Sequence, residues 1–401
     1  MSILRRVLLG LGLLALVAAS FGGGASVERS HPELLTWLPI LPSSSDRASV
    51  NQAYQLIRAN YYDPRVDPRK LSGAGIGAMV SSLGDPYSRY LDPQQYRQQQ
   101  AFYAGRYSGM IGIDVSFQGG YPVIAGLLPG SPAVRAGLEA GDVILRAGDT
   151  DLHGLSPDRV SALIRGPVGS QVTLVVSRGG VEREVTVTRG RFQSPTVEST
   201  RLAGDILYLR VYDFGDATQR EFDRRLGSGL PGARGVILDL RGNGGGYVGA
   251  AVAVISRFVR SGEAVEQRGR NGETVRTQVR GDHPAAGVPL VVLVNGDTAS
   301  AAEIVAGSLQ AHHRARLVGT RTFGKGSVQE DYPLANGGDL HLTVAHWYLP
   351  DGRSIQGRGL TPDVQVSLAA PQDMFDVVQP QRGYAKDAQL LRALELLQDG
   401  Q

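Results

Sequence analysis

The sequence predicts an α/β protein of several domains, and three observations carry that prediction. Apolar residues recur at helical spacing near the N-terminus, over residues 50–57 and 71–83. Short alternating segments separated by glycine turns follow over residues 107–189, which is typical of a β-rich module. Beyond them, the apolar runs at 235–240 and 290–294 each lead into a helix-like segment, the order expected of an α/β core.

The composition allows a core of this size and narrows the class of function. The 401 residues are 42% hydrophobic and 20% charged, which is ordinary for a globular protein of two or three domains. The net charge is +3, with 41 basic and 38 acidic residues and no long basic run, so the charge pattern does not indicate nucleic-acid binding. Because the chain has no cysteine, disulfides and a cysteine-based zinc site are excluded.

The first residues have the pattern of a signal peptide. Arg5 and Arg6 precede an apolar run from Val7 to Ala19, and small residues follow it as far as Gly24. The run is shorter than the roughly 20 apolar residues that a spanning helix needs, which favours a cleaved signal peptide over an uncleaved anchor. The protein is therefore expected outside the cytoplasm, in the periplasm, in the cell envelope or secreted, and an uncleaved N-terminal segment would be its route to a membrane.

The first candidate catalytic residue is Ser300. Leu290 to Val294 is a β-branched apolar run of the kind that forms a strand buried on both faces, and helix-like sequence begins at Ala301. N–H groups at the start of a helix lack partners and carry partial positive charge, so a hydroxyl there lies beside donors that can hold an oxyanion. Ser300 and Glu303 also fit a capping box, the commoner explanation of such a pair.

The second candidate is Lys325, which stands between Gly324 and Gly326. Glycine on both sides lets the backbone approach closely, and the two adjacent positions contribute no side chain that could contact the amine. A buried lysine without a carboxylate partner loses its proton more easily, because burial penalises the ammonium form. As a neutral amine it can take the proton of a serine hydroxyl.

The sequence TASAAE at residues 298–303, followed by TFGKGSVQ at residues 322–329, resembles the carboxy-terminal-processing serine peptidases, also called tail-specific proteases. The resemblance extends from about residue 50 to the end of the chain. It implies a crotonase-like α/β peptidase core with a Ser–Lys dyad. In that dyad Ser300 is the nucleophile, Lys325 is the general base, and Gln329 holds the lysine amine.

The same resemblance assigns the oxyanion donors. In the family a glycine-rich turn supplies one donor, and its match is the Gly245 N–H in the sequence RGNGGG; the Ala301 N–H is the second. Gly242 and Gly244 stand where the family pattern has asparagine and proline, which loosens the turn.

No metal or organic cofactor is implied. Two glycine-rich segments, 244–249 and 319–325, imitate nucleotide-binding loops. The first lacks the βαβ order of a dinucleotide fold, and the second has Gly326 where a serine or threonine would bind magnesium.

The β-rich module looks like a PDZ domain. Ser156 and Pro157 form a helix start, and the strand-like segments 172–177 and 181–187 form a hairpin by pattern. PDZ domains add an extended peptide to a sheet edge and hold its terminal carboxylate with loop N–H groups. The matching carboxylate loop is Met110, Ile111, Gly112 and Ile113, and Arg165 is a candidate contact to the bound peptide.

The predicted organisation is a signal peptide at 1–24, an N-terminal helical region at 46–98, a PDZ domain at 99–190, a Ser–Lys peptidase core at 195–370 and a C-terminal helical tail at 371–401. We expect a serine endopeptidase that captures protein or peptide substrates by their C-termini. Whether the protein forms a homo-oligomer or needs an adaptor stays open.

Two rival functions come from other classes. A non-catalytic PDZ scaffold would bind C-termini without cutting them, but it need not keep the spacing of Ser300, Lys325 and Gln329. A Ser–His–Asp hydrolase would pair Ser300 with a histidine, but the sequence has no G-x-S-x-G motif. The histidines considered are His312, His313 and His346.

Overall fold

The structure, a computed structural model, describes residues 44–63 and 65–398. The predicted signal peptide lies outside these residues. The chain divides into two compact units, residues 1–84 and 85–401. The division falls inside the predicted helical region at 46–98, because the residues after Gly84 form a strand that belongs to a sheet of the second unit.

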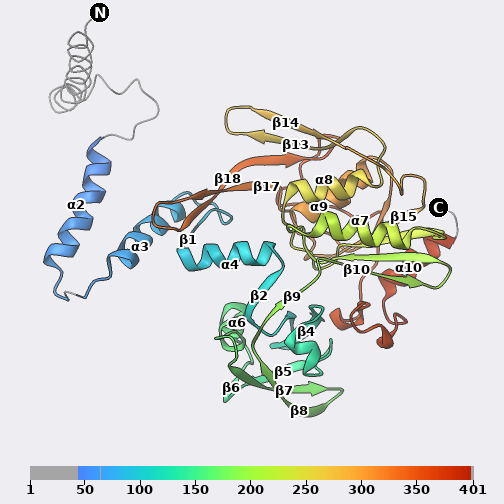
Figure 1. Ribbon diagram of the computed structural model, residues 1–401, viewed down its shortest axis with the longest axis horizontal. Coiled ribbons are helices and arrows are strands. Elements are labelled where there is room, and N and C mark those ends of the chain that lie inside the picture. Colours follow the sequence, from blue (N-terminus) through green and yellow to red (C-terminus); the bar gives the residue numbers. More distant parts are fainter. Residues whose placement is uncertain (1–43, 64, 399–401) are drawn as a thin grey trace, which may run out of the picture. The chain divides into compact units, whose positions relative to one another are not determined.

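The described part of the first unit contains the helices α2 (Ser44–Asn60) and α3 (Pro68–Ser81) (Figure 1). Helix α3 begins at a capping aspartate: Asp67 accepts a hydrogen bond of 2.8 Å from the Arg69 N–H, and Pro68 occupies the first turn. Val50 and Leu56 of α2 are exposed, so among the described residues of this unit the apolar face of α2 is not covered.

The β-rich module of the second unit is an antiparallel sheet in the order β3-β4-β5-β7-β8, with β6 beside β5 (Figure 1). Helices α5 and α6 each begin at a serine N-cap followed by proline. Fully buried side chains such as Ile124, Ile144 and Leu174 form its core. The predicted hairpin is confirmed as β7 and β8. The elements are β3 (Ile113–Gln118), β4 (Tyr121–Leu127), α5 (Pro132–Arg135), β5 (Val143–Ala147), β6 (Thr150–Asp151), α6 (Pro157–Ile164), β7 (Gln171–Arg178) and β8 (Val181–Thr188).

A separate pair of strands, β2 (Arg106–Met110) and β9 (Gly190–Gln193), carries the chain into and out of this module. The two strands are antiparallel, so the module is joined to the rest of the unit at one end (Figure 1).

The central sheet has the order β10-β11-β12-β15-β16-β19. Strand β10 is antiparallel to β11, and the other neighbours are parallel. Strands β12 and β15 are buried along their whole length, as their apolar runs predict. The strands are β10 (Val197–Leu202), β11 (Ile206–Val211), β12 (Gly235–Asp239), β15 (Leu290–Val294), β16 (Arg316–Gly319) and β19 (Val364–Gln365).

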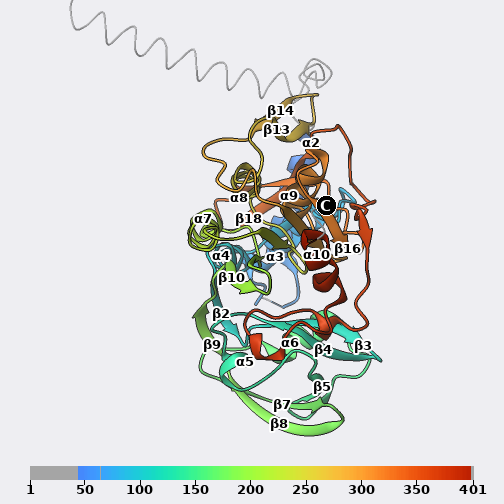
Figure 2. The same ribbon diagram turned by 90° about the vertical axis from the view of Figure 1, so that its right-hand side faces the viewer.

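Alternate residues of this sheet face two different layers. Leu238 and Val292 pack with helices α7, α8 and α9, whereas Ile237 and Leu293 pack with α10 (Figure 2). The amphipathic helix predicted near the C-terminus is therefore one of the covering layers. The helices are α7 (Thr218–Gly229), α8 (Val248–Ser256), α9 (Ala301–Ala311) and α10 (Ala388–Gln398).

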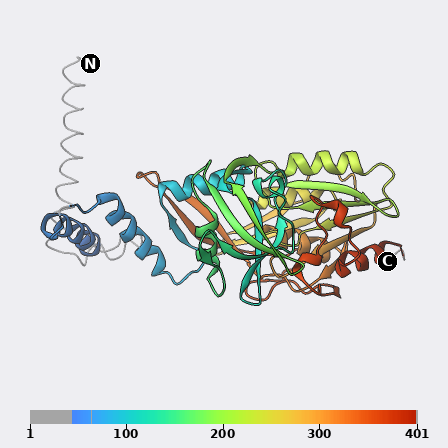
Figure 3. The same cartoon turned by 90° about the horizontal axis from the view of Figure 1, so that it is seen from below.

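A second sheet has the order β1-β18-β13-β14, with β17 paired to β18. Helix α4 (Pro93–Tyr103) runs beside it, and Gln99 of α4 donates a hydrogen bond to Asp331 of β17 (Figure 3). The strands are β1 (Arg89–Leu91), β13 (Glu263–Gly269), β14 (Thr274–Gln278), β17 (Ser327–Pro333) and β18 (Asp339–Tyr348).

The segment between β19 and α10 contacts the β-rich module. It contains two short 3-10 helices, η2 (Pro371–Asp373) and η3 (Pro380–Arg382), and Gln379 donates a hydrogen bond of 3.2 Å to the Leu138 carbonyl (Figure 2). Within residues 44–63 and 65–398, no helix has both the length and the apolar character needed to cross a bilayer.

Candidate active site

The predicted catalytic segments converge because of the parallel strand order. The glycine-rich turn follows β12, Ser300 follows β15, and the loop that contains Lys325 follows β16. These three strands are adjacent and parallel, so the segments after them leave the sheet at the same edge. Ligands of open α/β sheets bind outside this carboxyl edge.

Ser300 has a backbone conformation unlike that of an ordinary helix cap. Its φ is +56° and its ψ is −120°, whereas the capping serine Ser156 is extended, with φ −65° and ψ 153°. A positive φ is strained for a residue with a Cβ and occurs where a turn must present a side chain. The Ser156 hydroxyl accepts the Arg159 N–H, but no described residue makes a comparable cap hydrogen bond with the Ser300 hydroxyl. The Ser300 hydroxyl is therefore not used for capping.

Glu303 connects the turn of Ser300 to the loop of Lys325. Its carboxylate is fully buried, and one oxygen, Oε2, accepts both the Ser300 N–H at 3.0 Å and the Lys325 N–H at 2.9 Å. The other oxygen, Oε1, accepts the Thr322 hydroxyl and the Gly324 N–H. Burial raises the pKa of Glu303, and these four hydrogen bonds oppose that shift. The capping-box pattern predicted the contact to Ser300 but not the contacts to the lysine loop.

The Lys325 amine lies in a partly buried environment assembled from residues distant in sequence. Its Nζ is 5.2 Å from the centre of the Tyr87 ring, a cation–π distance. Burial and the Arg89 guanidinium lower the pKa of Lys325, while the Asp85 carboxylate opposes the shift. Asp85 acts on the amine from the segment before β1, an influence that the sequence around Lys325 does not indicate. The net shift of the Lys325 pKa is still downward, which favours the neutral amine.

Lys325 and Ser300 are brought together through the backbone. Within the described residues, no hydrogen bond joins the Ser300 hydroxyl to the Lys325 amine. Gln329 lies on β17, and its Nε2 donates to Ser327 Oγ at 2.9 Å and to Thr343 Oγ1 at 3.0 Å. In this arrangement the Gln329 amide ties β17 to β18 near the lysine loop.

The glycine-rich turn lies against Ser300. A Cβ on Gly245 would be 2.7 Å from Ser300 Cβ and 2.9 Å from Ala301 N, so only glycine fits there. The Gly245 N–H donates to Asn243 Oδ1 at 2.8 Å, whereas Ala301 is the first residue of α9, where an N–H has no intrahelical acceptor. Both predicted oxyanion donors therefore border the serine, and one of them is occupied by an asparagine side chain.

A buried ionic cluster supports the start of this turn. Arg241 is fully buried and contacts Asp239 at 2.6 Å and Asp387 at 2.9 Å. Burial would raise the pKa of Asp239, but the Arg241 and Arg210 guanidinium groups lower it to about 2. Sequence reasoning missed this cluster, because Asp387 lies far away in the chain. Its paired charges fix the backbone from which the glycine turn departs.

The predicted carboxylate loop lines a groove of the β-rich module. Met110, Ile111, Gly112 and Ile113 border a cavity of about 200 Å³ whose opposite wall is α6. Arg165, directly after α6, lines the same cavity. The residues predicted to bind a peptide terminus are thus brought together.

A second cavity, of about 400 Å³, extends from this groove toward the catalytic edge. Met110, Ile113 and Arg165 line it on the module side, and the glycines of the turn line it on the core side. Asp213 also faces this space, and burial raises the pKa of its carboxyl to about 6. The core glycines are Gly242, Gly244, Gly245 and Gly246.

The histidines considered as rival bases lie elsewhere. His312 and His313 follow the last residue of α9, whereas Ser300 precedes its first. A helix of 11 residues is about 16 Å long, so neither ring is near the hydroxyl. His346 is an exposed residue of β18 that pairs with Arg268 and Ser327.

Known protein families match three parts of the chain. Peptidase family S41 matches residues 205–366, a PDZ domain matches residues 123–178, and the activating protease CtpB N-terminal domain matches residues 33–95. The PDZ prediction is thereby confirmed for the β-rich module.

Relatives extend the likeness over most of the chain. A carboxy-terminal-processing protease of Bartonella bacilliformis is 36% identical over 314 residues, covering 76% of this chain and 72% of that protein. The carboxy-terminal processing protease CtpA of Bacillus subtilis is 34% identical over 322 residues, covering 80% of this chain and 68% of that protein.

Solved structures agree with this likeness. The photosystem II D1 C-terminal processing protease has a TM-score of 0.56 and 28% identity, and the match covers 82% of this chain and 95% of that one. A putative S41 protease of Bacteroides fragilis, at 17% identity, shares the fold with a TM-score of 0.60 over 91% of this chain and all of that one. Because this similarity extends over most of its length, the chain belongs to the carboxy-terminal-processing serine peptidases of family S41.

Proposed function

We propose that the chain is an endopeptidase that cuts peptide bonds with a Ser300–Lys325 dyad. The observation that carries the proposal is the single Glu303 oxygen that accepts the backbone N–H groups of both residues. A buried carboxylate held by four donors is rigid, so it fixes the serine turn and the lysine loop relative to each other. Rigid placement of a nucleophile beside its base is what covalent catalysis requires.

The chemistry follows from the groups at this edge. The neutral Lys325 amine takes the proton of the Ser300 hydroxyl as its oxygen attacks the substrate carbonyl carbon. The oxyanion that forms is held by the N–H groups of Ala301 and Gly245, and the second requires that the Asn243 hydrogen bond opens. The lysine then gives the proton to the leaving amine, and water releases the acyl group. In this scheme Gln329 restrains the lysine loop and holds the amine once substrate is bound.

The same proposal includes capture of substrate C-termini by the PDZ groove. Backbone N–H groups of the loop from Met110 to Ile113 would hold the terminal carboxylate, and Arg165 supplies a positive charge at the passage to the catalytic edge. We also propose that the N-terminal residues 1–24 direct the chain out of the cytoplasm, where it meets its substrates.

The dyad is tested by Ser300→Ala, with Ser308→Ala as the matched control. Ser308 is a buried serine on the same helix whose hydroxyl has no hydrogen-bond partner within the described residues. We expect Ser300→Ala to abolish hydrolysis of an unstructured peptide while the far-UV circular dichroism stays unchanged. We expect Ser308→Ala to keep its activity. If the activity of Ser300→Ala fell only a few-fold, Ser300 would not be the nucleophile.

Capture is tested with one peptide made in two forms, with a free C-terminal carboxylate and with a C-terminal amide. The acid should be cleaved at a higher kcat/KM than the amide, because the amide lacks the charge that the loop binds. Arg165→Gln should reduce this preference, and Arg159→Gln, on the helix that precedes Arg165, should not. Equal cleavage of both forms by the wild type would refute capture and leave the dyad untouched.

A further inference from the structure

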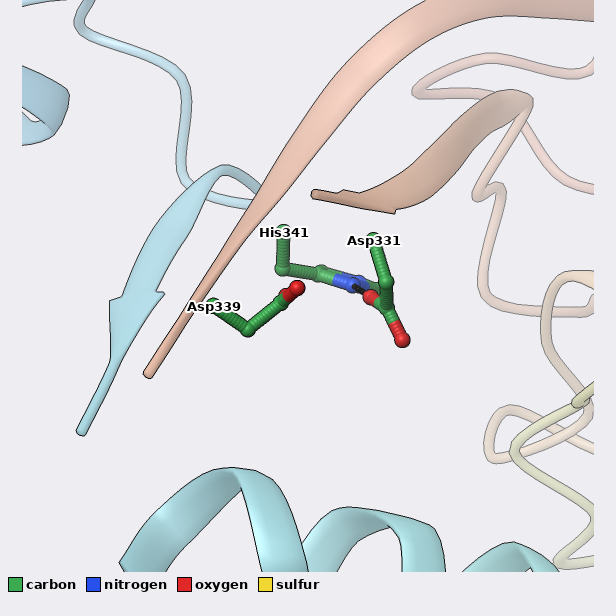
Figure 4. Close-up of side chains that lie close together, drawn as sticks. All are labelled: Asp331, Asp339 and His341. Carbon is green, nitrogen blue, oxygen red and sulfur yellow. Dashed lines mark hydrogen bonds and ion pairs between the residues drawn. The ribbon is translucent and has the colours of Figure 1, made fainter. Parts of the chain in front are cut away.

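Three side chains with metal-binding groups meet on the hairpin formed by β17 and β18. Asp331 lies directly opposite His341 in the strand register, and Asp339 is two residues before His341, so it shares a face with it. One ligand atom from each of the three lies within 4.8 Å of the others. Figure 4 shows the two carboxylates and the imidazole directed toward a common point. The cluster lies outside the catalytic segments described above.

The Asp339 carboxylate is the unusual member of this cluster. It is fully buried, and neither of its oxygens has a hydrogen-bond partner anywhere in the described residues. Buried carboxylates are normally paired or hydrogen-bonded, since leaving one unsatisfied costs about 1–3 kcal/mol or more. The site thus holds an acid whose ionised form has no positive partner.

The surrounding groups do not supply that partner. His341 Nδ1 is 2.5 Å from Asp331 Oδ1, and the Gln99 amide donates to the same carboxylate. The guanidinium of Arg89 is engaged with Gln99 Oε1 at 2.9 Å and forms no ion pair with either aspartate in the described part of the chain.

We propose that Asp331, Asp339 and His341 bind a divalent transition-metal ion of the Zn²⁺ class. Two carboxylate oxygens and one imidazole nitrogen form a ligand set that suits Zn²⁺, whereas Mg²⁺ and Ca²⁺ prefer oxygen ligands alone. The ion takes the place of the direct contact between His341 Nδ1 and Asp331, and it gives the Asp339 carboxylate a positive partner. Ligand atoms around tetrahedral zinc are about 3.3 Å apart, so exposed Asp331 must rotate away from His341.

The position of the cluster indicates a structural role for the metal. It joins the two strands of the hairpin near the turn, and Asp331 also contacts α4 through Gln99. Gln329 is two residues before Asp331 on β17, but its side chain is bonded to Ser327 and Thr343 rather than to the cluster. A bound ion would therefore stabilise the hairpin.

The test is calorimetric titration of Zn²⁺ into the full chain, freed of metal with EDTA, dialysed and carrying no histidine tag. Wild-type protein should bind one ion saturably at pH 7.5. Asp339→Asn and His341→Ala should weaken binding by about 10-fold or more, because each removes a ligand and even supporting residues of metal sites have effects of this size. Glu330→Gln is the matched control, since it removes one acid from an exposed position on β17 beside Asp331.

Thermal unfolding provides the second readout. Zn²⁺ should raise the unfolding temperature of the wild type and of Glu330→Gln but not of Asp339→Asn or His341→Ala, and Mg²⁺ and Ca²⁺ should have no such effect. If Asp339→Asn does not fold, the partly exposed His341→Ala decides. Absence of saturable Zn²⁺ binding by the wild type would overturn the proposal, and so would unchanged affinity in His341→Ala.

Discussion

Glu303 and Asp339 are both fully buried carboxylates of the same unit, yet their surroundings differ completely. Glu303 accepts four hydrogen bonds from two segments of the catalytic edge. Asp339 accepts none from the described residues, and its nearest acidic neighbour is another aspartate. Burial raises the pKa of both groups, so burial alone does not distinguish them.

The difference shows what a buried charge can do in a protein. A carboxylate that is surrounded by backbone N–H groups joins segments that are distant in sequence, so it positions the residues around it. A carboxylate without donors contributes nothing to such positioning, and its ionised form is stable only with a cation. Removing the charge should therefore have opposite consequences at the two sites.

The largest effect is expected for Glu303→Gln. Glutamine keeps the size of the side chain but places an NH₂ group against at least one N–H donor, so the shared contact to Ser300 and Lys325 is disturbed. We expect kcat for peptide hydrolysis to fall on the order of 100-fold, because misplacement by about 1 Å has effects of this size. Stability should fall by about 2–3 kcal/mol.

Glu221→Gln is the control that separates positioning from stability. Glu221 is also an acid in the first turn of a helix, and its Oε2 accepts the N–H groups of Thr196 and Val197, away from the dyad. The Glu221→Gln substitution should lower the unfolding midpoint in urea without a comparable loss of kcat. Equal losses of kcat in the two variants would show that Glu303 acts through stability alone.

A smaller effect of opposite sign is expected for Asp339→Asn. In EDTA at pH 8 the variant loses no hydrogen bond and removes a buried charge beside Asp331, so the free energy of unfolding should rise by about 1–2 kcal/mol. Urea unfolding of both proteins measures this difference. Destabilisation by Asp339→Asn under these metal-free conditions would contradict the view that its carboxylate lacks a favourable partner.

The smallest effect is expected at an ordinary serine cap. Ser156→Ala removes the hydroxyl that accepts the Arg159 N–H at the start of α6, which should cost about 1 kcal/mol of stability. Its catalytic constant should not change when the substrate is saturating. A large fall in kcat would mean that α6 contributes more to the catalytic edge than the groove contacts indicate.

Much of the fold follows from local patterns in the sequence. The apolar run at Leu290 to Val294 predicts a buried strand, and the alternation around Gly179 and Gly180 predicts the β7–β8 hairpin; both are present. These predictions succeed because strand burial and hairpin turns depend on residues that are close in sequence. Ser300 and Lys325 were likewise found from their local motifs, and their roles stay predictions.

The parts that sequence reasoning missed depend on contacts between distant segments. Nothing in the glycine-rich context of Lys325 indicates that Asp85, Tyr87 and Arg89 surround its amine. The cluster of Asp331 and His341 becomes visible only once the strand register of the hairpin is known.

The most direct test of the central claim is the pH dependence of peptide hydrolysis by wild type, Lys325→Ala and Lys325→Arg. Lys325 must be neutral to accept the Ser300 proton, and burial with nearby Arg89 lowers its pKa, so wild-type activity should rise with pH on a limb below the ordinary pKa of lysine. Arginine stays protonated, so Lys325→Arg should be as inactive as Lys325→Ala at every pH from about 6 to 10. Substantial hydrolysis by Lys325→Arg would contradict the account and return a histidine such as His346 to consideration as the base.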